Sequence, residues 1–452
     1  MTPQRNPTVA VVGGGLAGLV AARHLAAAGV DATLYERRDE VGGRVRTLER
    51  DGYRFDRGFQ VLFTDYPAVR AELDLEALAL RPFAPGAVIA RDGHRSTLSD
   101  PLRDPRALPA TLLNRDVTLG DKLRVLRLRR RLAGTDPETI FTGEDTTIRE
   151  YLHAQGFSQR FITHFAAPFY GGITLDRSLS TSKRVFEYTF RTLSSGSIAV
   201  PAAGMGAIPA QIADRARTAG ARIETGVTVT AVDAKDDGDG DGDGDIDDES
   251  VTYTLEGATD ATADAVVVAT DPPTARELTS LESIPTAGKG CLTQFYAMPK
   301  RTDLESGGRL ILNADDDAGP NHVVPHSEVA PEYAPDDASL ISATYLAWPN
   351  DGDGTPDDTD EITDDETLFE RTRATLAAWY PERRFGDLEP VHTERVPFAQ
   401  FAQPPGIHDR LPSVCDPDGA VYLAGDYTQW SSIQGALESG RVAASAVIRD
   451  LE

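Results

Sequence analysis

Cysteine is scarce in this 452-residue chain, and its scarcity excludes several classes of protein. Cys291 and Cys415 are the only cysteines, too few for a disulfide framework or for a cysteine-ligated zinc or iron–sulfur site. A chain without disulfides is typical of a reducing compartment, so we expect a cytoplasmic protein. No run of about eighteen apolar residues is uninterrupted, and we therefore expect no membrane-spanning helix.

Positive charge is also in short supply. The formal net charge is −26, lysine occurs at only five positions, and arginine supplies nearly all the cations. A surface of this kind repels a polyanion, so nucleic acid is not expected as a partner. Excess acid with little lysine predicts adaptation to a high-salt cytoplasm, where screening removes the self-repulsion of the folded chain. The length and the 40% content of hydrophobic residues suit two domains with substantial cores.

The first 36 residues have the pattern of a dinucleotide-binding unit. Apolar residues predict a strand, a helix and a second strand over 9–12, 16–28 and 33–35. The turn between the first strand and the helix reads G-x-G-x-x-G, at Gly13, Gly15 and Gly18. The first glycine permits the turn, the second lets backbone approach a pyrophosphate, and the third lets helix pack on strand. Glu36 ends the second strand, where its carboxylate can accept hydrogen bonds from ribose hydroxyls.

Gly42, Gly43 and Arg44 form a second motif shortly after this unit. Two adjacent glycines let the chain pass close to a diphosphate, and the arginine can add charge-assisted hydrogen bonds to it. The glycine triplet by itself does not distinguish NAD from FAD. The choice between these cofactors therefore depends on this motif and on a third one far along the chain.

The third motif lies near the C-terminus. A strand over 420–424 runs into Gly425 and Asp426, and a turn of small residues leads to a helix from about Ser432 to Arg449. The carboxylate can face the ribityl or diphosphate part of a flavin dinucleotide, and the free amides at the helix start can face the flavin pyrimidine oxygens. Motifs at both ends of the chain suit an extended cofactor such as FAD.

The rest of the chain is less regular. The segment from about 95 to 195 has helical stretches such as 121–132, and alternating apolar residues predict strands over 223–232, 251–255 and 263–269. Two acidic low-complexity tracts, Asp236–Glu249 and Asp351–Glu366, interrupt this pattern. The first resembles the start of a calcium loop, but strands and not helices flank it. We interpret both tracts as solvated insertions and predict no metal site.

At its three motifs the chain resembles the flavin-containing amine oxidase superfamily, which includes monoamine oxidases, protoporphyrinogen oxidases and carotenoid or squalene-type desaturases. The resemblance covers 9–58 and 421–447 and touches the centre at 200–209. It implies an α/β fold with a Rossmann-type FAD-binding domain, whose parallel sheet is assembled from discontinuous segments, and an inserted α+β substrate domain. The expected FAD-binding domain comprises 1–90, 198–285 and 410–452, and the expected substrate domain comprises 91–197 and 286–409.

The resemblance also implies a cofactor and the residues that bind it. The cofactor is FAD, held without a covalent bond. The run Asp56-Arg57-Gly58 resembles the segment that approaches the flavin, and Val227 resembles the strand residue whose backbone faces the adenine. The implied binding residues are Gly13, Gly15, Leu16, Ala17, Gly18, Glu36, Arg37, Gly42, Gly43, Arg44, Gly58, Val227, Gly425, Asp426, Ser432 and Ile433.

Within the superfamily the sequence departs from the amine-oxidising branch. Those enzymes place two aromatic side chains beside the flavin, and the matching positions here are Ala399 and Ser432. Their lysine near the flavin has no clear counterpart, although Lys289 is close in sequence. The ending Gly425-Asp426-Tyr427-Thr428 is more similar to desaturases of carotenoid and squalene metabolism, so we expect hydride removal from a lipophilic substrate.

Two other functions remain open. An amine or protoporphyrinogen oxidase would release hydrogen peroxide with a polar or tetrapyrrole substrate, and a non-catalytic protein would use its flavin structurally. Hydride delivery to a flavin needs no protein nucleophile. We assign no catalytic acid or base, because such a group must lie within hydrogen-bond reach of the substrate and the sequence gives no such geometry. The aromatic cluster of Phe161, Phe165, Phe169 and Tyr170 either lines a pocket for the lipophilic substrate or packs the inserted domain.

The expected partners are a small lipophilic substrate and a separate electron acceptor, namely oxygen, a quinone or a carrier. Gly204-Met205-Gly206 lacks the spacing of a second dinucleotide turn, so bound NADPH is not expected. Lys122–Arg131 contains six basic residues among leucines. This segment predicts either a helix docked on the inner face of an anionic membrane or a helix whose arginines pair with the surrounding acids.

Overall fold

The computed structural model describes residues 6–100, 103–233, 250–257, 260–300, 302, 304–315, 318–346 and 364–452. The first acidic tract, Asp236–Glu249, lies outside these residues, as do residues 351–363 of the second. The remaining residues of the second tract are structured, since Asp364 caps helix α13 (Asp365–Trp379) by accepting a hydrogen bond from the Thr367 amide. No helix within the described ranges combines the length and the apolar character needed to cross a bilayer.

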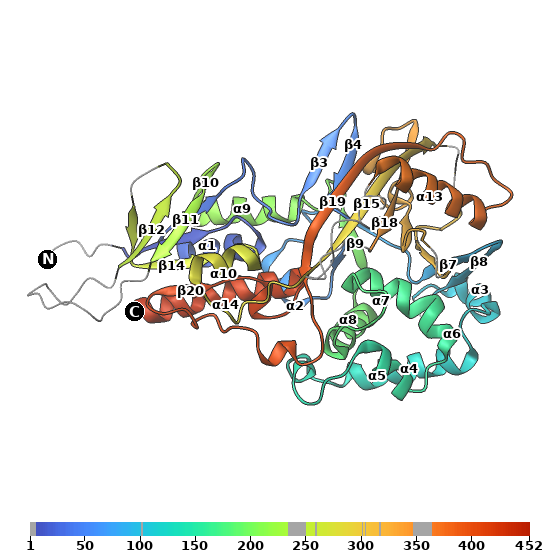
Figure 1. The fold of residues 1–452 in the computed structure, drawn as a ribbon, viewed down its shortest axis with the longest axis horizontal. Helices are drawn as coiled ribbons and strands as arrows, with labels where there is room; N and C mark the ends of the chain where they lie inside the picture. Colours follow the sequence, from blue (N-terminus) through green and yellow to red (C-terminus); the bar gives the residue numbers. More distant parts are fainter. Residues whose placement is uncertain are drawn as a thin grey trace, which may run out of the picture.

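A five-stranded parallel sheet forms the core of one half of the molecule (Figure 1). Its order is β10 (Arg222–Thr225), β2 (Asp31–Glu36), β1 (Thr8–Val12), β14 (Ala265–Val268) and β20 (Val421–Leu423). Every neighbouring pair is parallel, so all five carboxyl ends lie at one edge. The strands come from four separate stretches of the chain. The prediction of a parallel sheet assembled from discontinuous segments is therefore confirmed.

Both faces of this sheet are covered, which explains why β1 and β14 are almost entirely alanine and valine. Val9 and Val11 face a core that includes α1 (Leu16–Ala27), α9 (Ala207–Ala219) and α14 (Ile433–Leu451). Ala10 and Val12 face the opposite core. That core is covered by β11 (Val229–Asp233), β12 (Val251–Leu255), β13 (Ala261–Ala263) and α10 (Pro272–Thr279).

Helix α1 carries apolar residues on all sides because it lies between the sheet and two other helices, α9 and α14. Its approach to α14 is close at Gly440, where an added Cβ would lie 2.2 Å from the Ala17 carbonyl oxygen. This packing fixes the two motif-bearing ends of the chain against each other.

The prediction of one strand over 223–232 was wrong, because the chain divides it between two sheets. Gly226 adopts a φ of +72°, and its amide donates to the Arg38 carbonyl oxygen. The residues before it form β10 of the parallel sheet, and those after it form β11, antiparallel to β12. The expected strand over 263–269 is likewise divided at Asp264, whose carboxylate accepts hydrogen bonds from the amide and hydroxyl of Thr8.

A seven-stranded mixed sheet forms the centre of the other half. Its order is β19 (Glu389–Phe401), β15 (Gly288–Pro299), β18 (Ala338–Tyr345), β17 (His322–Val324), β16 (Leu310–Asn313), β7 (Ala87–Arg91) and β8 (His94–Leu98). Helix α13 packs on it through Leu376 and Trp379. The long strands β15 and β19 extend from this half towards the parallel sheet (Figure 1).

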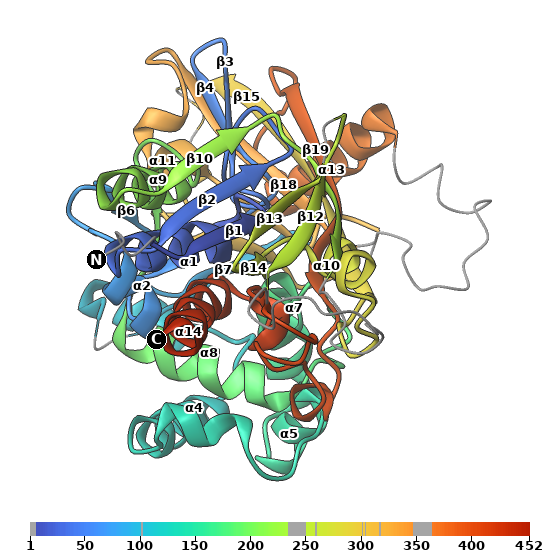
Figure 2. The ribbon, with the colours of Figure 1, turned by 90° about the vertical axis from the view of Figure 1, so that its left-hand side faces the viewer.

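A layer of helices lies below the mixed sheet in Figure 1. It consists of α3 (Leu108–Leu113), α4 (Leu119–Ala133), α5 (Ile148–Ala154), α6 (Gln159–Phe161), a π-helical turn (Ile162–Ala166), α7 (Ala167–Thr174) and α8 (Lys183–Ser195). The helix expected over 121–132 is α4. In Figure 2, α8 lies between α4 and α14. The predicted α/β fold with a second, mixed α+β part is confirmed, and the division into two domains at the expected residues stays a prediction.

Short elements connect the two halves. They are β3 (Thr47–Arg50) with β4 (Tyr53–Asp56), the sheet of β5 (Leu62–Phe63), β9 (Ile198–Pro201) and β6 (Leu80–Pro82), and the helices α2 (Pro67–Glu72) and α11 (His326–Val329). Two histidines are buried, His322 on β17 of the mixed sheet and His326 on α11. Burial lowers the pKa of His322 to about 4 and that of His326 to about 3. His326 Nε2 lies 2.9 Å from Ser342 Oγ, and its ring stacks on Tyr333.

These histidines should make the stability depend on pH in the acid range. The unfolded chain takes up a proton near pH 6.5, whereas the folded protein resists it down to about pH 4. The free energy of unfolding should therefore fall as the pH decreases through this window, by up to about 1.4 kcal/mol per pH unit for each histidine. His326→Gln keeps a hydrogen-bonding group beside Ser342 and should reduce this slope in denaturant titrations at constant salt. Equal slopes for the two proteins would contradict the prediction.

Candidate functional site

A cavity of about 550 Å³ opens at the carboxyl edge of the parallel sheet. Residues that follow all five strands line it: Gly13 after β1, Arg37 after β2, Val227 after β10, Thr270 after β14 and Gly425 after β20. This edge is where open α/β sheets bind their ligands, because the loops and helix N-termini converge there. The strand order alone therefore places a ligand site at this position.

The glycine turn has the geometry of a phosphate cradle. Gly13 has a φ of +111°, and a Cβ there would lie 2.7 Å from the Ala269 carbonyl oxygen. A Cβ on Gly18 would lie 2.0 Å from the Gly13 carbonyl oxygen, so this glycine serves the packing of helix on strand. Gly15 differs, because a Cβ there would meet no protein atom within 4 Å. Its missing side chain leaves room for a ligand at the N-terminus of α1.

The second motif, Gly42-Gly43-Arg44, contacts the glycine turn. The Gly42 amide donates to the Gly14 carbonyl oxygen at 2.8 Å. Gly43 has a φ of +59°, and a Cβ there would lie 3.2 Å from the Gly15 Cα. Glu36 is 5% exposed and accepts hydrogen bonds from the amides of Gly14 and Arg38, at 2.8 and 3.0 Å. These contacts join the glycine turn, the end of β2 and the second motif into one wall.

Four arginines line the same cavity, namely Arg37, Arg38, Arg44 and Arg57. Burial and repulsion from neighbouring arginines lower the pKa of Arg38 and Arg57. A concentration of cations that repel one another is stabilised by a bound anion. The cradle, the cations and the helix N-terminus together fit the diphosphate of a dinucleotide.

An ion pair joins the two ends of the chain beside this wall. Arg44 Nη2 lies 2.7 Å from Asp426 Oδ1, and its Nη1 donates to the Ala399 carbonyl oxygen. The other carboxylate oxygen of Asp426 accepts a hydrogen bond from the Ser431 hydroxyl. Ser432 caps α14, because its side chain accepts from the Gly435 amide at 2.8 Å. The third motif is thereby fixed against the second.

Strand β15 brings a thiol to the cavity and keeps a lysine away from it. Cys291 lines the cavity, with its sulfur 3.6 Å from the position of a Cβ on Gly58. Burial raises the pKa of the Cys291 thiol to about 12. Lys289 does not line the cavity, and its ammonium lies 3.0 Å from Asp176 Oδ2. Lys289, the lysine closest in sequence to the position that amine oxidases use beside the flavin, is therefore paired with Asp176 outside the cavity lining.

The half of the cavity away from the sheet edge is mostly apolar, although His322 lies there beside Phe59, with ring centroids 5.0 Å apart. Its lining includes Phe59, Tyr66, Phe169, Ile173, Leu312 and Trp430. The only acidic residues among the described lining residues are Glu36, Asp271 and Asp426, all of which follow or end strands of the parallel sheet. The cavity thus has a charged half at the sheet edge and a mostly apolar half to which the mixed sheet and α7 contribute lining residues.

Fifteen of the sixteen residues that the sequence implies for cofactor binding line this one cavity. Gly18 is the exception and packs α1 on β1. Arg57 and Gly58 line the cavity, but Asp56 points away from it. Its carboxylate accepts hydrogen bonds from the Thr47 and Tyr333 hydroxyls and from the Met205 amide. Of the aromatic cluster, Phe169 lines the cavity, whereas Phe161, Phe165 and Tyr170 belong to or pack against a separate helical core.

Several lining residues were missed from the sequence. Asp271 follows β14 and could have been found, because a strand of the same parallel sheet must end at the same edge. His322 and Trp430 carry no local signal, since each reaches the cavity only through the packing of distant segments. His322 Nδ1 lies 3.0 Å from the side-chain nitrogen of Asn321.

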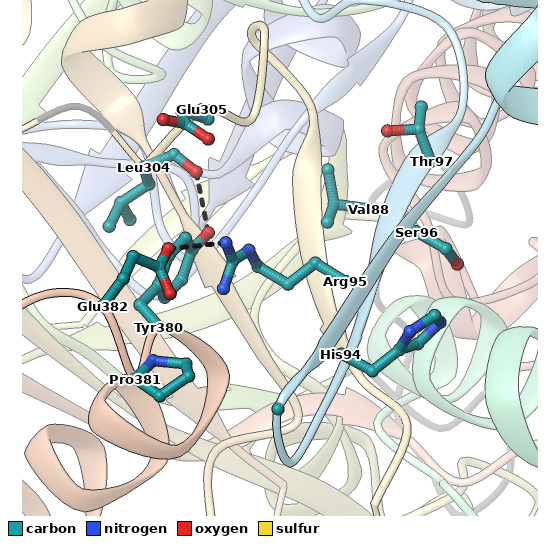
Figure 3. Close-up of a pocket in the computed structure, with 11 residues that line it drawn as sticks. Val88, His94, Arg95, Ser96, Thr97, Leu304, Glu305, Tyr380, Pro381 and Glu382 are labelled. Atoms are coloured by element: carbon teal, nitrogen blue, oxygen red, sulfur yellow. Dashed lines mark hydrogen bonds and ion pairs between the residues drawn. The ribbon is translucent and has the colours of Figure 1, made fainter.

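A second cavity of about 420 Å³ lies between β8 and the end of α13 (Figure 3). Arg95 donates to Glu382 at 2.6 Å and lies over the ring of Tyr380, whose hydroxyl donates to the Leu304 carbonyl oxygen. None of the residues implied for cofactor binding lines it. Other lining groups pair with residues outside the lining, as His94 does with Asp116 and Glu305 with Arg383, so we assign the cavity a structural role.

Comparisons with known proteins agree with this geometry. The sequence profile of the flavin containing amine oxidoreductase family matches residues 16–448. The carotenoid 3,4-desaturase of Haloarcula japonica is 56% identical over 58 residues, which is 13% of this chain and 12% of that protein. A 4,4′-diapophytoene desaturase of Staphylococcus haemolyticus is 48% identical over 50 residues, 11% of this chain and 10% of that protein. The matched stretches thus span only about a tenth of these relatives.

Solved structures share the fold over the whole chain. A protoporphyrinogen oxidase-like protein from Exiguobacterium sp. 255-15 has a TM-score of 0.69 at 16% identity, and the match covers 99% of this chain and 100% of that chain. Putrescine oxidase bound to putrescine has a TM-score of 0.68 at 17% identity, with the same coverage. Because the family profile extends over nearly all of the sequence, the protein belongs to the flavin containing amine oxidoreductase family and is a flavin-dependent oxidoreductase.

Proposed function

We propose that the protein binds FAD without a covalent bond and removes hydride from a lipophilic substrate, as a desaturase or dehydrogenase of an isoprenoid-like hydrocarbon. The observation that carries this proposal is the division of one cavity into a cationic half and an apolar half. The first suits a dinucleotide, and the second suits a substrate without charge. FAD supplies the acceptor for a hydride taken from a C–H bond.

Different residues of the cavity would contact different parts of FAD. Gly15, Gly43 and the arginines around them would hold the diphosphate, and Glu36 would accept hydrogen bonds from the adenosine ribose. The backbone of Val227, whose amide donates to the Glu36 carbonyl oxygen, would face the adenine. The N-terminus of α14 at Ser432 and Ile433 would meet the flavin pyrimidine oxygens. Gln60 Oε1, a buried acceptor without a partner among the described residues, remains free to accept a hydrogen bond from the cofactor.

The lining of the apolar half favours a hydrocarbon over an amine. An ammonium group needs a carboxylate or an aromatic cage to replace its hydration. The lining acids all lie in the cationic half, and Ala399 and Ser432 occupy the two positions at which amine oxidases of the superfamily place aromatic rings. Similarity to the carotenoid 3,4-desaturase of Haloarcula japonica also favours a hydrocarbon substrate. Amine or protoporphyrinogen oxidation is the second candidate, supported by the fold shared with proteins of those names.

The remaining partner is an electron acceptor, which we propose to be oxygen, a quinone or a carrier. Residues 204–206 form a tight turn whose two glycines pack against Thr47. A Cβ on Gly204 would lie 2.4 Å from the Thr47 hydroxyl oxygen, and the Gly206 amide donates to that same oxygen. This packing leaves the turn no role as a second dinucleotide site.

Gly15→Val separates cofactor binding from folding. A valine there meets no protein atom close to its Cβ but occupies the place proposed for the diphosphate. The variant should unfold at nearly the same denaturant concentration as the cofactor-free parent, yet bind FAD at least about tenfold more weakly in flavin fluorescence titrations. Gly386→Val is the matched control, because a Cβ there also meets nothing within 4 Å and Gly386 does not line the cavity. Unchanged flavin binding by Gly15→Val would refute the placement of the diphosphate.

Anaerobic reduction of the bound flavin tests the proposed reaction. The purified holoprotein in molar salt is mixed with a detergent-dispersed acyclic isoprenoid hydrocarbon, with putrescine or with protoporphyrinogen, and the visible absorbance of the flavin is followed. The account expects bleaching by the hydrocarbon alone. Bleaching by the amine or the tetrapyrrole instead would select the second candidate, and no bleaching by any donor would favour a structural flavin.

A further inference from the structure

The large apolar side chains with the greatest exposure gather on one part of the surface. Among the residues that the structure describes, five are markedly exposed, and four of these lie on α3 or α4. They are Leu108, Leu119, Leu123 and Leu126, with exposed fractions of 40, 67, 60 and 50%. Such a concentration on consecutive helices is a mark of an interaction surface, whereas single exposed leucines are common.

Helix α4 presents two different faces because of its spacing. Val125, Leu128 and Leu132 recur at three and four residues and pack into the helical core. Leu119, Leu123, Leu126 and Arg130 recur at the same intervals on the outer face. Asp121 fixes this orientation, since its buried carboxylate accepts hydrogen bonds from the amide and hydroxyl of Ser158. The leucines are therefore held outward by the packing of the opposite face.

The arginines of α4 divide into two groups. Arg129 pairs with Asp100 and Arg131 with Glu187, each at 2.7 Å, as the structural interpretation of this segment predicted. Arg127 and Arg130 are exposed, and within the described ranges no acidic group lies within 4.0 Å of either guanidinium. Both cations lie beside the row of exposed leucines, on a chain whose formal net charge is −26.

We propose that the outer surface of α3 and α4 docks the protein on an anionic lipid bilayer. The leucines would enter the boundary between headgroups and acyl chains, and Arg127 and Arg130 would meet lipid phosphates. Arginines lie on the same helix face as the leucines, not in a ring around an apolar centre. Long side chains that carry their charge to a headgroup layer suit this mixture, whereas the core of a protein interface is depleted of charge.

The docking surface is connected to the active-site cavity through packed rings. Leu128 and Leu132 on the inner face of α4 share a core with Phe157 and Phe161. Phe161, Phe165 and Phe169 follow one another with ring centroids 5.4 and 5.2 Å apart, and Phe169 lines the apolar half of the cavity. Figure 1 shows α4 and α7 in the same helical layer. Docking would thus bring the apolar half close to a membrane-dissolved substrate, an inference that rests on the proposed function.

Vesicle sedimentation tests the docking surface without requiring turnover. The holoprotein is incubated with phosphatidylglycerol vesicles and with phosphatidylcholine vesicles, at the lowest salt at which its circular dichroism shows it folded. We expect binding to phosphatidylglycerol that weakens at least about tenfold in the combined variant Leu119→Ser, Leu123→Ser and Leu126→Ser. Arg127→Gln with Arg130→Gln should weaken binding in low salt and have less effect in molar salt, where charges are screened.

Control variants distinguish docking through this surface from nonspecific binding to vesicles and from misfolding. Leu48→Ser removes the fifth exposed leucine, on β3, and Arg217→Gln with Arg441→Gln removes two exposed arginines on other helices. These variants should bind vesicles as the parent does, and all variants should keep their flavin and their thermal unfolding midpoint. Absence of vesicle binding by the parent, or equal binding by the triple leucine variant, would overturn the proposal. Because flavin reduction by hydrocarbon in detergent is measured separately, either idea can fail alone.

Discussion

The ion pair between Arg44 and Asp426 holds the site together, because it connects segments 382 residues apart in the sequence. Asp426 is 2% exposed, and a carboxylate at such a position must be paired and hydrogen-bonded to remain charged. Arg44 and Ser431 supply these contacts. The parallel sheet makes the pair geometrically available, since β1 and β20 end at the same edge on either side of β14. Through this pair the second motif, which contacts the glycine turn, is joined to Ser431, just before the cap of α14.

The sequence predicted best where a chemical requirement fixes residue types at short spacing. The glycine turn, Glu36 and the Gly42-Gly43-Arg44 run lie together at the sheet edge, since they contact one another within the first βαβ unit and the turn that follows it. The C-terminal motif could be predicted for a similar reason, as a strand end followed by a capped helix. The prediction of one continuous strand failed at Gly226. The alternation of apolar residues continues through this residue, although the chain passes there from one sheet to another.

The position of Lys289 shows a different limit. Residues two apart in a strand face the same side, so Lys289 and Cys291 would both be expected at the cavity or both away from it. The pairing of β15 with β19 shifts register between these two residues, and the irregularity re-aims one side chain. Alternation in sequence contains no signal for such a bulge. His322 and Trp430 escaped prediction because they reach the cavity from β17 and from the segment before α14, through packing alone.

The helical layer lies between the cavity and one part of the protein surface. Its inner side supplies Phe169 to the apolar half of the cavity, and its outer side carries the exposed leucines of α4. A π-helical turn lies between α6 and α7, a feature that frequently marks functional sites because it re-aims the residues that follow. Under the two proposals, the inner side of this layer would contact the lipophilic substrate and its outer side the bilayer that dissolves it.

The most direct test of the central claim is a crystal structure of the purified protein grown with its bound cofactor. The account predicts FAD in the cavity at the sheet edge, with its diphosphate between Gly15 and Gly43 and its flavin ring between Gly58 and the N-terminus of α14. A colourless protein that takes up no FAD, or FAD bound away from the joint between Arg44 and Asp426, would contradict it.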